Sequence, residues 1–130
     1  MANQKIRRIY VAGLMTPKGT NSSHPAIDFL ANIKNLIRAS LDVLFAGYDP
    51  FCPGLDFQYF LALRDGEFIT EAMIKRLSKS WLEACHAVVL TPGWRQSAGT
   101  LAEIKFAEER GIPVFKSLNE LIKFTGGVEG

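Results

Sequence analysis

Ala87-Val-Val-Leu90 is a short apolar run that predicts a buried β-strand, and Thr91-Pro-Gly-Trp-Arg-Gln-Ser-Ala-Gly-Thr-Leu-Ala-Glu103 follows it directly. Pro92 and Gly93 end the strand, and Ser97 is placed to cap a helix that begins just after it. The stretch therefore predicts a strand, a loop and the start of a helix. Because the first N–H groups of a helix have no partner within the helix, a corner of this kind binds anions.

Glu103 stands one helical turn after Gly99 in this predicted helix. Helical side chains lean towards the N-terminus, so we expect the Glu103 carboxylate to point over a residue without a side chain, into the mouth of the corner. A carboxylate beside an anion-binding corner suits a phosphorylated or polyhydroxylated ligand. The same spacing also fits a solvated helix glutamate, with Gly99 as a packing gap.

Strand and helix patterns alternate along the whole chain. We expect strands at residues 6–12, 42–46, 86–90 and 112–115, and helices from Ser22 or Ser23 to about Ser40 and at 67–84, 101–110 and 117–124. Segment 47–66 has no clear period, and Asp56 is placed to cap a short helix within it. The alternation predicts one domain, residues 1–130, with an α/β, Rossmann or flavodoxin-like three-layer fold around a parallel sheet of four to five strands.

Parallel sheets of this class bind ligands beyond the carboxyl ends of their strands, where the strand order reverses. Segments 13–21, 47–66 and 91–100 should meet there. Lys18 is a candidate for contacting a phosphate. The aromatic side chains of 47–66 are candidates for stacking on a base, and they fit a place in the core or in a subunit contact equally well.

The overall composition is that of an ordinary globular chain, with 130 residues, 48% hydrophobic, 22% charged and a net charge of +2. The small net charge gives no reason to expect a nucleic-acid partner, and no apolar run reaches the length of a membrane span, about 20 residues. The start lacks the apolar segment of a signal peptide. Cys52 and Cys85 are isolated, and no Cys/His cluster has metal-site spacing, so we expect a cytoplasmic protein with reduced thiols and no metal or other cofactor.

Three short motifs are Ile9-Tyr-Val-Ala-Gly13, Trp81-Leu-Glu-Ala-Cys-His-Ala-Val-Val-Leu90 and Ser97-Ala-Gly-Thr-Leu-Ala-Glu103. Together they resemble the nucleoside 2-deoxyribosyltransferase family, which includes the deoxynucleotide N-hydrolases. The resemblance implies that Glu103 is a nucleophile and that Tyr10 is the active-site tyrosine beside it. The serine at Ser97 resembles the residue that contacts the sugar or its 5′-phosphate in the nucleotide hydrolases.

The resemblance also implies an activity, which is cleavage or transfer of the N-glycosidic bond of a nucleoside or nucleoside 5′-monophosphate. With Ser97, the substrate-binding candidates are Ala98, Gly99, Gly13, Lys18 and Trp94. Trp94 covers the base in this interpretation, or packs on a neighbouring subunit in the alternative. Members of the resembled family form dimers or larger assemblies, so a homo-oligomer is expected.

One position departs from the pattern of the resembled family. Its catalytic aspartate falls on Ser78 here, because His86 stands where the family has the aspartate that opens the third strand. A serine hydroxyl is not suited to general acid work near neutral pH. Asp56, Asp65 and Glu71 are the candidates to replace it. The alternative is a non-catalytic nucleotide-binding module of the same fold.

Overall fold

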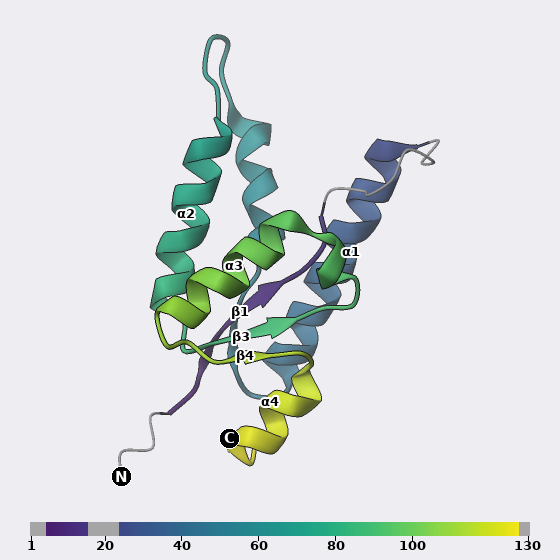
Figure 1. The fold of residues 1–130 in the computed structure, drawn as a ribbon. Helices are drawn as coiled ribbons and strands as arrows, with labels where there is room; N and C mark the ends of the chain where they lie inside the picture. The colour runs from purple at the N-terminus through teal and green to yellow at the C-terminus, as the bar shows by residue number, and fades with distance from the viewer. Residues whose placement is uncertain (1–4, 16–23, 128–130) are drawn as a thin grey trace.

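Among the residues that the computed structural model describes, 5–15 and 24–127, four strands form one parallel sheet (Figure 1). The strands are β1 (Arg8–Ala12), β2 (Asp49–Phe51), β3 (Ala87–Leu90) and β4 (Val114–Phe115), in the order β2-β1-β3-β4. The chain passes from β1 to its neighbour β2 and then crosses back to β3 on the other side of β1. The strand order therefore reverses between β1 and β3, as in the predicted Rossmann or flavodoxin-like three-layer fold.

Helices cover both faces of the sheet (Figure 1). They are α1 (Pro25–Phe45), the 3₁₀ segment η1 (Pro53–Ala62), α2 (Glu71–Ala84), the 3₁₀ turn η2 (Trp94–Gln96), α3 (Ala98–Glu109) and α4 (Leu118–Thr125). Ile9 and Val11 pack with side chains of α1 and α4, whereas Tyr10 and Ala12 pack with side chains of α2 and α3. This division follows from the pleat of a strand, and it directs Tyr10 towards α2 and α3.

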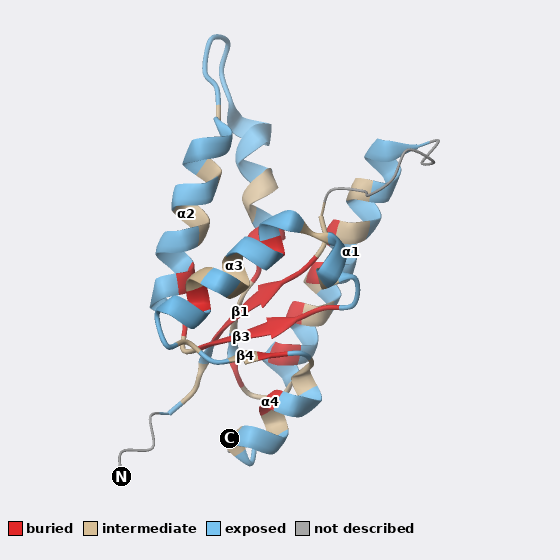
Figure 2. Cartoon of the chain, viewed as in Figure 1, coloured by how far each residue is buried: buried red, intermediate tan, exposed pale blue. Residues whose placement is uncertain are grey.

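The two central strands form the most buried part of the molecule (Figure 2). Each residue of Ile9–Ala12 and of β3 exposes 4% of its surface or less. Full burial of one Val, Leu or Ile side chain contributes roughly 1.5–3 kcal/mol. The core is therefore centred on β1 and β3, which also carry the carboxyl-terminal edge where a ligand is expected.

The strand expected at 42–46 is wrong, because residues 42–45 continue α1. Val43 lies seven residues after Leu36 and is buried with it, so the helical period extends beyond Ser40. The second strand is instead β2, within the segment that showed no period. It contains Pro50 and lies at an edge of the sheet, where a residue without an N–H group is tolerated.

Capping residues explain where two other helices begin. Thr70 accepts a hydrogen bond from the N–H of Met73 at 3.1 Å, so α2 begins at Glu71 and not at residue 67. Ser97 caps α3 in the same way, so this helix begins at Ala98, three residues before the expected start. β1, β3, β4 and α4 agree with their expected ranges to within two residues at each end.

Asp56 does not cap η1, because Cys52 stands at the position before that segment. The cap expected at Ser22 or Ser23 lies outside the described residues. α2 and η1 extend together beyond the sheet, as does the N-terminal half of α1 (Figure 1), and these outer parts are largely exposed (Figure 2). Within the described part of the chain, no helix combines the length and the apolar character that a membrane crossing needs.

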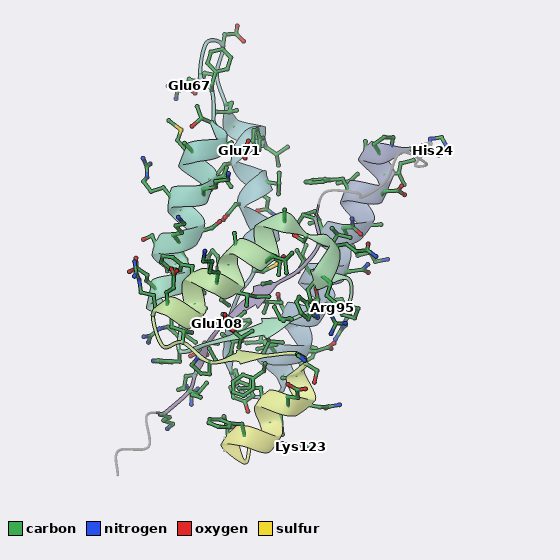
Figure 3. All side chains as sticks on the ribbon, in the orientation of Figure 1. His24, Glu67, Glu71, Arg95, Glu108 and Lys123 are labelled. Atoms are coloured by element: carbon green, nitrogen blue, oxygen red, sulfur yellow. The ribbon has the colours of Figure 1, made fainter. Side chains whose placement is uncertain are left out.

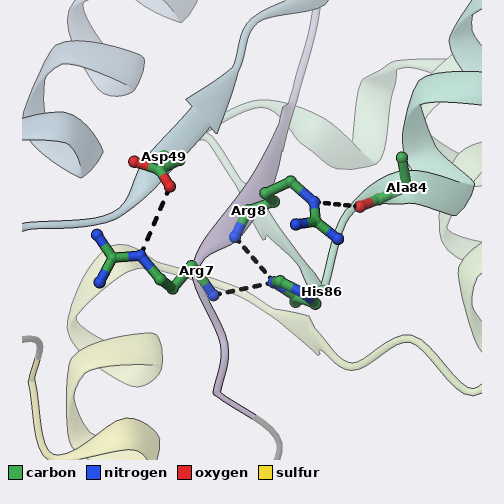
Figure 4. Close-up of polar contacts among 5 residues, drawn as sticks. All are labelled: Arg7, Arg8, Asp49, Ala84 and His86. Atoms are coloured by element: carbon green, nitrogen blue, oxygen red, sulfur yellow. Dashed lines mark hydrogen bonds and ion pairs between the residues drawn. The ribbon is translucent and has the colours of Figure 1, made fainter.

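His86 ties the start of β1 to the start of β3 (Figure 4). Its Nδ1 accepts hydrogen bonds from the backbone N–H groups of Arg7 and Arg8, both at 3.0 Å, and Nε of Arg8 donates to the carbonyl of Ala84 at 2.6 Å. Nδ1 can accept these bonds only while it carries no proton. Burial, together with the Arg8 charge, lowers the pKa of His86, which favours the neutral imidazole.

Candidate active site

Tyr10 and Glu103 meet on the face of the sheet that α2 and α3 cover. The Tyr10 hydroxyl donates a hydrogen bond to Oε2 of Glu103 at 2.5 Å. Tyr10 is fully buried on β1, and Glu103 is half-buried on the second turn of α3. The structure thus brings together the two residues for which the resemblance implies catalytic roles, and Glu103 is not a solvated helix glutamate.

The two groups influence each other's protonation. Burial raises the pKa of Glu103, and the hydrogen bond from Tyr10 acts in the opposite direction. Burial also raises the pKa of Tyr10, and the charge of Glu103 raises it further. The phenol therefore remains protonated and stays the donor, while Glu103 is the acceptor.

Ser78 and Asp56 act on the same phenol. A hydrogen bond with the Ser78 side chain lowers the pKa of Tyr10, and the charge of Asp56 raises it. Ser78, where the resembled family has an aspartate, thus lies at the site and supplies only a hydroxyl group. Of the described residues, the one buried side-chain oxygen or nitrogen without a hydrogen-bond partner is Oδ2 of Asp56. Burial raises the pKa of this carboxyl group.

Asp65 and Glu71, the other two candidates for the missing carboxylate, lie away from this cluster. Asp65 is exposed in the turn between η1 and α2. Glu71 is exposed at the outer end of α2 (Figure 3), where it forms an ion pair with Lys75 at 3.0 Å. Spacing along the chain did not distinguish the three carboxylates, whereas burial selects Asp56.

An aromatic stack packs against the Tyr10 ring. The Phe51 ring lies 5.6 Å from that of Tyr10 at an interplanar angle of 25°, and the Trp81 ring lies 5.2 Å from that of Phe51 at 15°. The stack joins β1, β2 and α2, and it restricts the orientation of the phenol. Phe51 was expected only as one of several aromatics in an irregular segment, because its strand was not predicted.

The start of α3 has the expected capping geometry. Oγ of Ser97 accepts from the N–H of Thr100 at 3.1 Å and from its hydroxyl at 2.9 Å. Both contacts use Oγ as an acceptor, so the Ser97 proton can be donated to a ligand. Ala98 and Gly99 are exposed at the first two positions of the helix, whose N–H groups have no partner within it.

The two glycines among the candidates have different surroundings. A Cβ atom at Gly99 would meet only Oγ of Ser97, at 3.9 Å, so the space beside it is open. A Cβ atom at Gly13 would lie 1.8 Å from Oγ1 of Thr91. Gly13 is buried, and this close approach accounts for a glycine there without any ligand. Lys18 lies outside the described residues.

Trp94 is half-buried against the core beneath α2 and α3, and the Arg95 guanidinium lies 4.7 Å from the centre of its ring. Both residues line a cavity of about 520 Å³ that opens between α1, the loop 91–96 and the start of α4. Tyr10 and Glu103 do not line this cavity. The candidate site is therefore defined by the Tyr10 phenol and by the carboxyl groups of Glu103 and Asp56 that act on it, and the cavity is a neighbouring feature. The sequence gives no reason to place Arg95 at the site or at the cavity, because a single arginine in a loop forms no recognisable motif.

Comparison with known protein families assigns this chain to a family. The family model described as Domain of unknown function (DUF7768) matches residues 22–117. No curated protein matches the chain. A solved structure similar to this chain is the "Crystal structure of conserved protein from Enterococcus faecalis V583", with 24% identity over 85% of this chain and a TM-score of 0.48. This chain spans 62% of that one.

Proposed function

We propose that this chain, which belongs to the family described as Domain of unknown function (DUF7768), cleaves or transfers the N-glycosidic bond of a nucleoside or nucleoside 5′-monophosphate. Glu103 is the nucleophile in this proposal, and Tyr10 positions it. The observation that carries the proposal is the hydrogen bond between these two side chains, which joins α3 to β1, a strand next to the point where strand order reverses. A half-buried carboxylate held by a buried phenol, next to an open helix start, fits a sugar with an anionic substituent.

The chemistry begins with charge at the sugar. Breaking an N-glycosidic bond develops positive charge on the anomeric carbon, which a carboxylate stabilises or attacks. Because Oε2 of Glu103 accepts the hydrogen bond from Tyr10, Oε1 is the oxygen that forms the glycosyl ester. Water then attacks the ester, which gives hydrolysis, or a second base attacks it, which gives transfer.

The start of α3 supports a 5′-phosphate in the ligand. The N–H groups of Ala98 and Gly99 belong to the first turn of α3, next to the Ser97 hydroxyl that caps it, and the positive end of the helix dipole favours an anion there. The open space at Gly99 leaves room for such a group. Trp94, which lies in the loop before this helix start, is the candidate to cover the base.

A panel assay tests this function. Purified protein is incubated at high concentration with the common ribo- and deoxyribonucleosides and their 5′-monophosphates, with and without a second free base, and free or exchanged base is measured by chromatography. We expect base release or exchange with at least one of them. No release and no exchange across the panel would refute the proposed activity.

A second candidate is a nucleotide-binding module without catalysis. The observation in its favour is Ser78, since a hydroxyl group stands where the resembled family has a carboxylate. This candidate predicts a saturable thermal shift with a nucleotide and no turnover. Turnover that disappears in Glu103→Ala would exclude it.

The proposal includes a cytoplasmic location, which the two thiols support. Cys52 and Cys85 are both free and buried, and burial raises the pKa of Cys85 to about 11. A buried thiol with a raised pKa reacts slowly and needs no disulfide partner.

A further inference from the structure

We infer that Asp56 of η1 is the general acid that protonates the leaving base, an inference that rests on the proposed glycosidic reaction. A base leaves a sugar as an anion unless a proton reaches it in the transition state. General acid catalysis of this kind contributes roughly 10²–10⁴-fold to the rate. Ser78 cannot supply that proton near neutral pH, so another group must supply it if the reaction occurs.

The position of Asp56 fits this role. Its Oδ2 is buried and has no hydrogen-bond partner among the described residues, although carboxylate oxygens in such places are normally bonded. η1 packs against α1 and β1, and the charge of Asp56 acts on the phenol that holds Glu103. One carboxyl group is therefore fixed by Tyr10, and the second belongs to a segment packed on the same strand, acts on the same phenol and has one oxygen unpaired among the described residues.

The surroundings of Asp56 also favour its protonated form. Burial raises the pKa of this group, which keeps the acid available at higher pH than on the surface. On the α1 side, η1 makes apolar contacts, in which Phe29 packs on Phe57 and Ile33 lies beside Gly54. The charge of Asp56 acts on Tyr10, which in turn donates its hydrogen bond to Glu103.

The reaction then balances with two carboxyl groups. Glu103 forms a bond to the anomeric carbon while the carbon–nitrogen bond breaks. The electron pair of the broken bond stays on the base, which takes the proton from Asp56. In hydrolysis, water attacks the anomeric carbon of the ester, Asp56 takes a proton from that water, and Glu103 leaves as a carboxylate. Both residues end in their starting states, and no other reactant is consumed.

The test compares a substrate that needs protonation with one that does not. The guanine base of 2′-deoxyguanosine 5′-monophosphate leaves readily only when it is protonated. The base of the 7-methyl derivative is already cationic, so it leaves as a neutral molecule without a proton from the protein. Wild type, Asp56→Asn, Glu103→Gln and the matched controls Asp65→Asn and Glu71→Gln are assayed with both, after a thermal melt confirms that each variant is folded.

We expect Asp56→Asn to reduce turnover of the ordinary substrate by about 10²-fold or more and that of the methylated substrate by less than about 10-fold. The basic limb of its pH profile should disappear, because that limb reports the loss of the proton from the acid. Glu103→Gln should lose both activities, and the two controls should keep both.

Two results would overturn the inference. Equal losses on both substrates in Asp56→Asn, or no loss on either, would remove Asp56 from the acid role while the proposed function stands. Wild type that cleaves only the methylated substrate would do the same, since it would lack an effective acid. Wild type that releases base from neither substrate nor from any member of the nucleoside and nucleotide panel would instead refute the proposed function, and the inference with it.

Discussion

The hydroxyl of Tyr10 donates a hydrogen bond to Oε2 of Glu103 and joins β1 to α3 across 93 residues of sequence. Tyr10 is fully buried, and both burial and the Glu103 charge raise its pKa, so the phenol keeps its proton. The same bond lowers the pKa of Glu103 against the effect of burial. The contact thus fixes the orientation of the carboxylate and favours its ionised form.

Glu103→Gln should abolish turnover and leave binding nearly intact. The amide keeps the size of the side chain and an acceptor for Tyr10, but it cannot form the glycosyl ester. We expect a loss of at least about 10³-fold in kcat, with the Kd of a bound nucleotide changed by less than about threefold. Single-turnover assays and calorimetry measure the two. Glu109→Gln, an exposed glutamate on the same helix, is the control. Wild-type turnover in Glu103→Gln would make the nucleophile assignment wrong.

Tyr10→Phe should shift the acid limb of the pH profile. Glu103 must be ionised to attack, and loss of the Tyr10 donor removes the interaction that lowers its pKa. The pKa of Glu103 therefore rises, and kcat/KM should begin to fall at a higher pH as the solution is acidified. The variant should also lose about 1.5–3 kcal/mol of stability, because a charged acceptor loses its bond. A profile that superimposes on that of wild type would contradict this role for Tyr10.

Ser97→Ala and Ser117→Ala form a matched pair. Each serine caps a helix, with the N–H of Thr100 bonded to Ser97 at 3.1 Å and that of Glu120 bonded to Ser117 at 3.2 Å. Each substitution should cost about 1 kcal/mol of stability, measured by denaturant unfolding. Only Ser97→Ala should also weaken binding of nucleoside 5′-monophosphates, by about tenfold relative to the nucleosides, because it removes one charge-assisted hydrogen bond to phosphate. Equal effects of the two variants on ligand preference would assign Ser97 to capping alone.

His86 should make stability depend on pH. Its pKa is lower in the folded chain than the ordinary value of 6.5, so the unfolded chain binds the proton more readily. The stabilisation is therefore present above pH 6.5 and is lost as the pH falls through the lower, folded pKa. His86→Asn keeps an acceptor for the Arg7 and Arg8 N–H groups but does not titrate. It should remove most of the loss of stability that wild type shows between pH 7.5 and pH 5.

The control for this measurement is His24→Asn, since His24 makes no side-chain capping bond at the start of α1. Denaturant midpoints from pH 7.5 to 5 give the comparison. The expected order is a smaller fall in His86→Asn than in either wild type or His24→Asn. An identical fall in stability in all three proteins would show that titration of His86 does not affect stability in this range.

Assembly of this chain with further copies of itself stays a prediction. The outer parts of α1, η1 and α2, with the loop that joins η1 to α2, extend beyond the sheet (Figure 1) and expose apolar side chains, with Leu61 87% and Phe68 80% exposed. Patches of this kind commonly mark protein contacts. Light scattering at micromolar concentration should give at least a dimer, and Leu61→Lys with Phe68→Lys should shift it towards monomer. A monomer in the wild type would contradict the prediction.

Local sequence patterns alone determined the class of the fold and one corner of the site. The apolar runs at β1 and β3, the turn at Pro92-Gly93 and the cap at Ser97 each involve residues close together in the chain. Propensity, periodicity and capping act over that range, so these features could be predicted. The error at 42–46 has the same origin, because an apolar end of a helix and a short strand look alike until packing decides between them.

Tertiary structure decided which side chains meet. Tyr10 reaches Glu103 only because β1 lies beside β3 and its pleat directs the phenol towards α3. Asp56, Asp65 and Glu71 precede Ser78 by 22, 13 and 7 residues, and this spacing does not single out Asp56. Packing of η1 against β1 buries one of them and leaves the others in water. Burial and convergence are properties of strand order and long-range contact, which no local pattern contains.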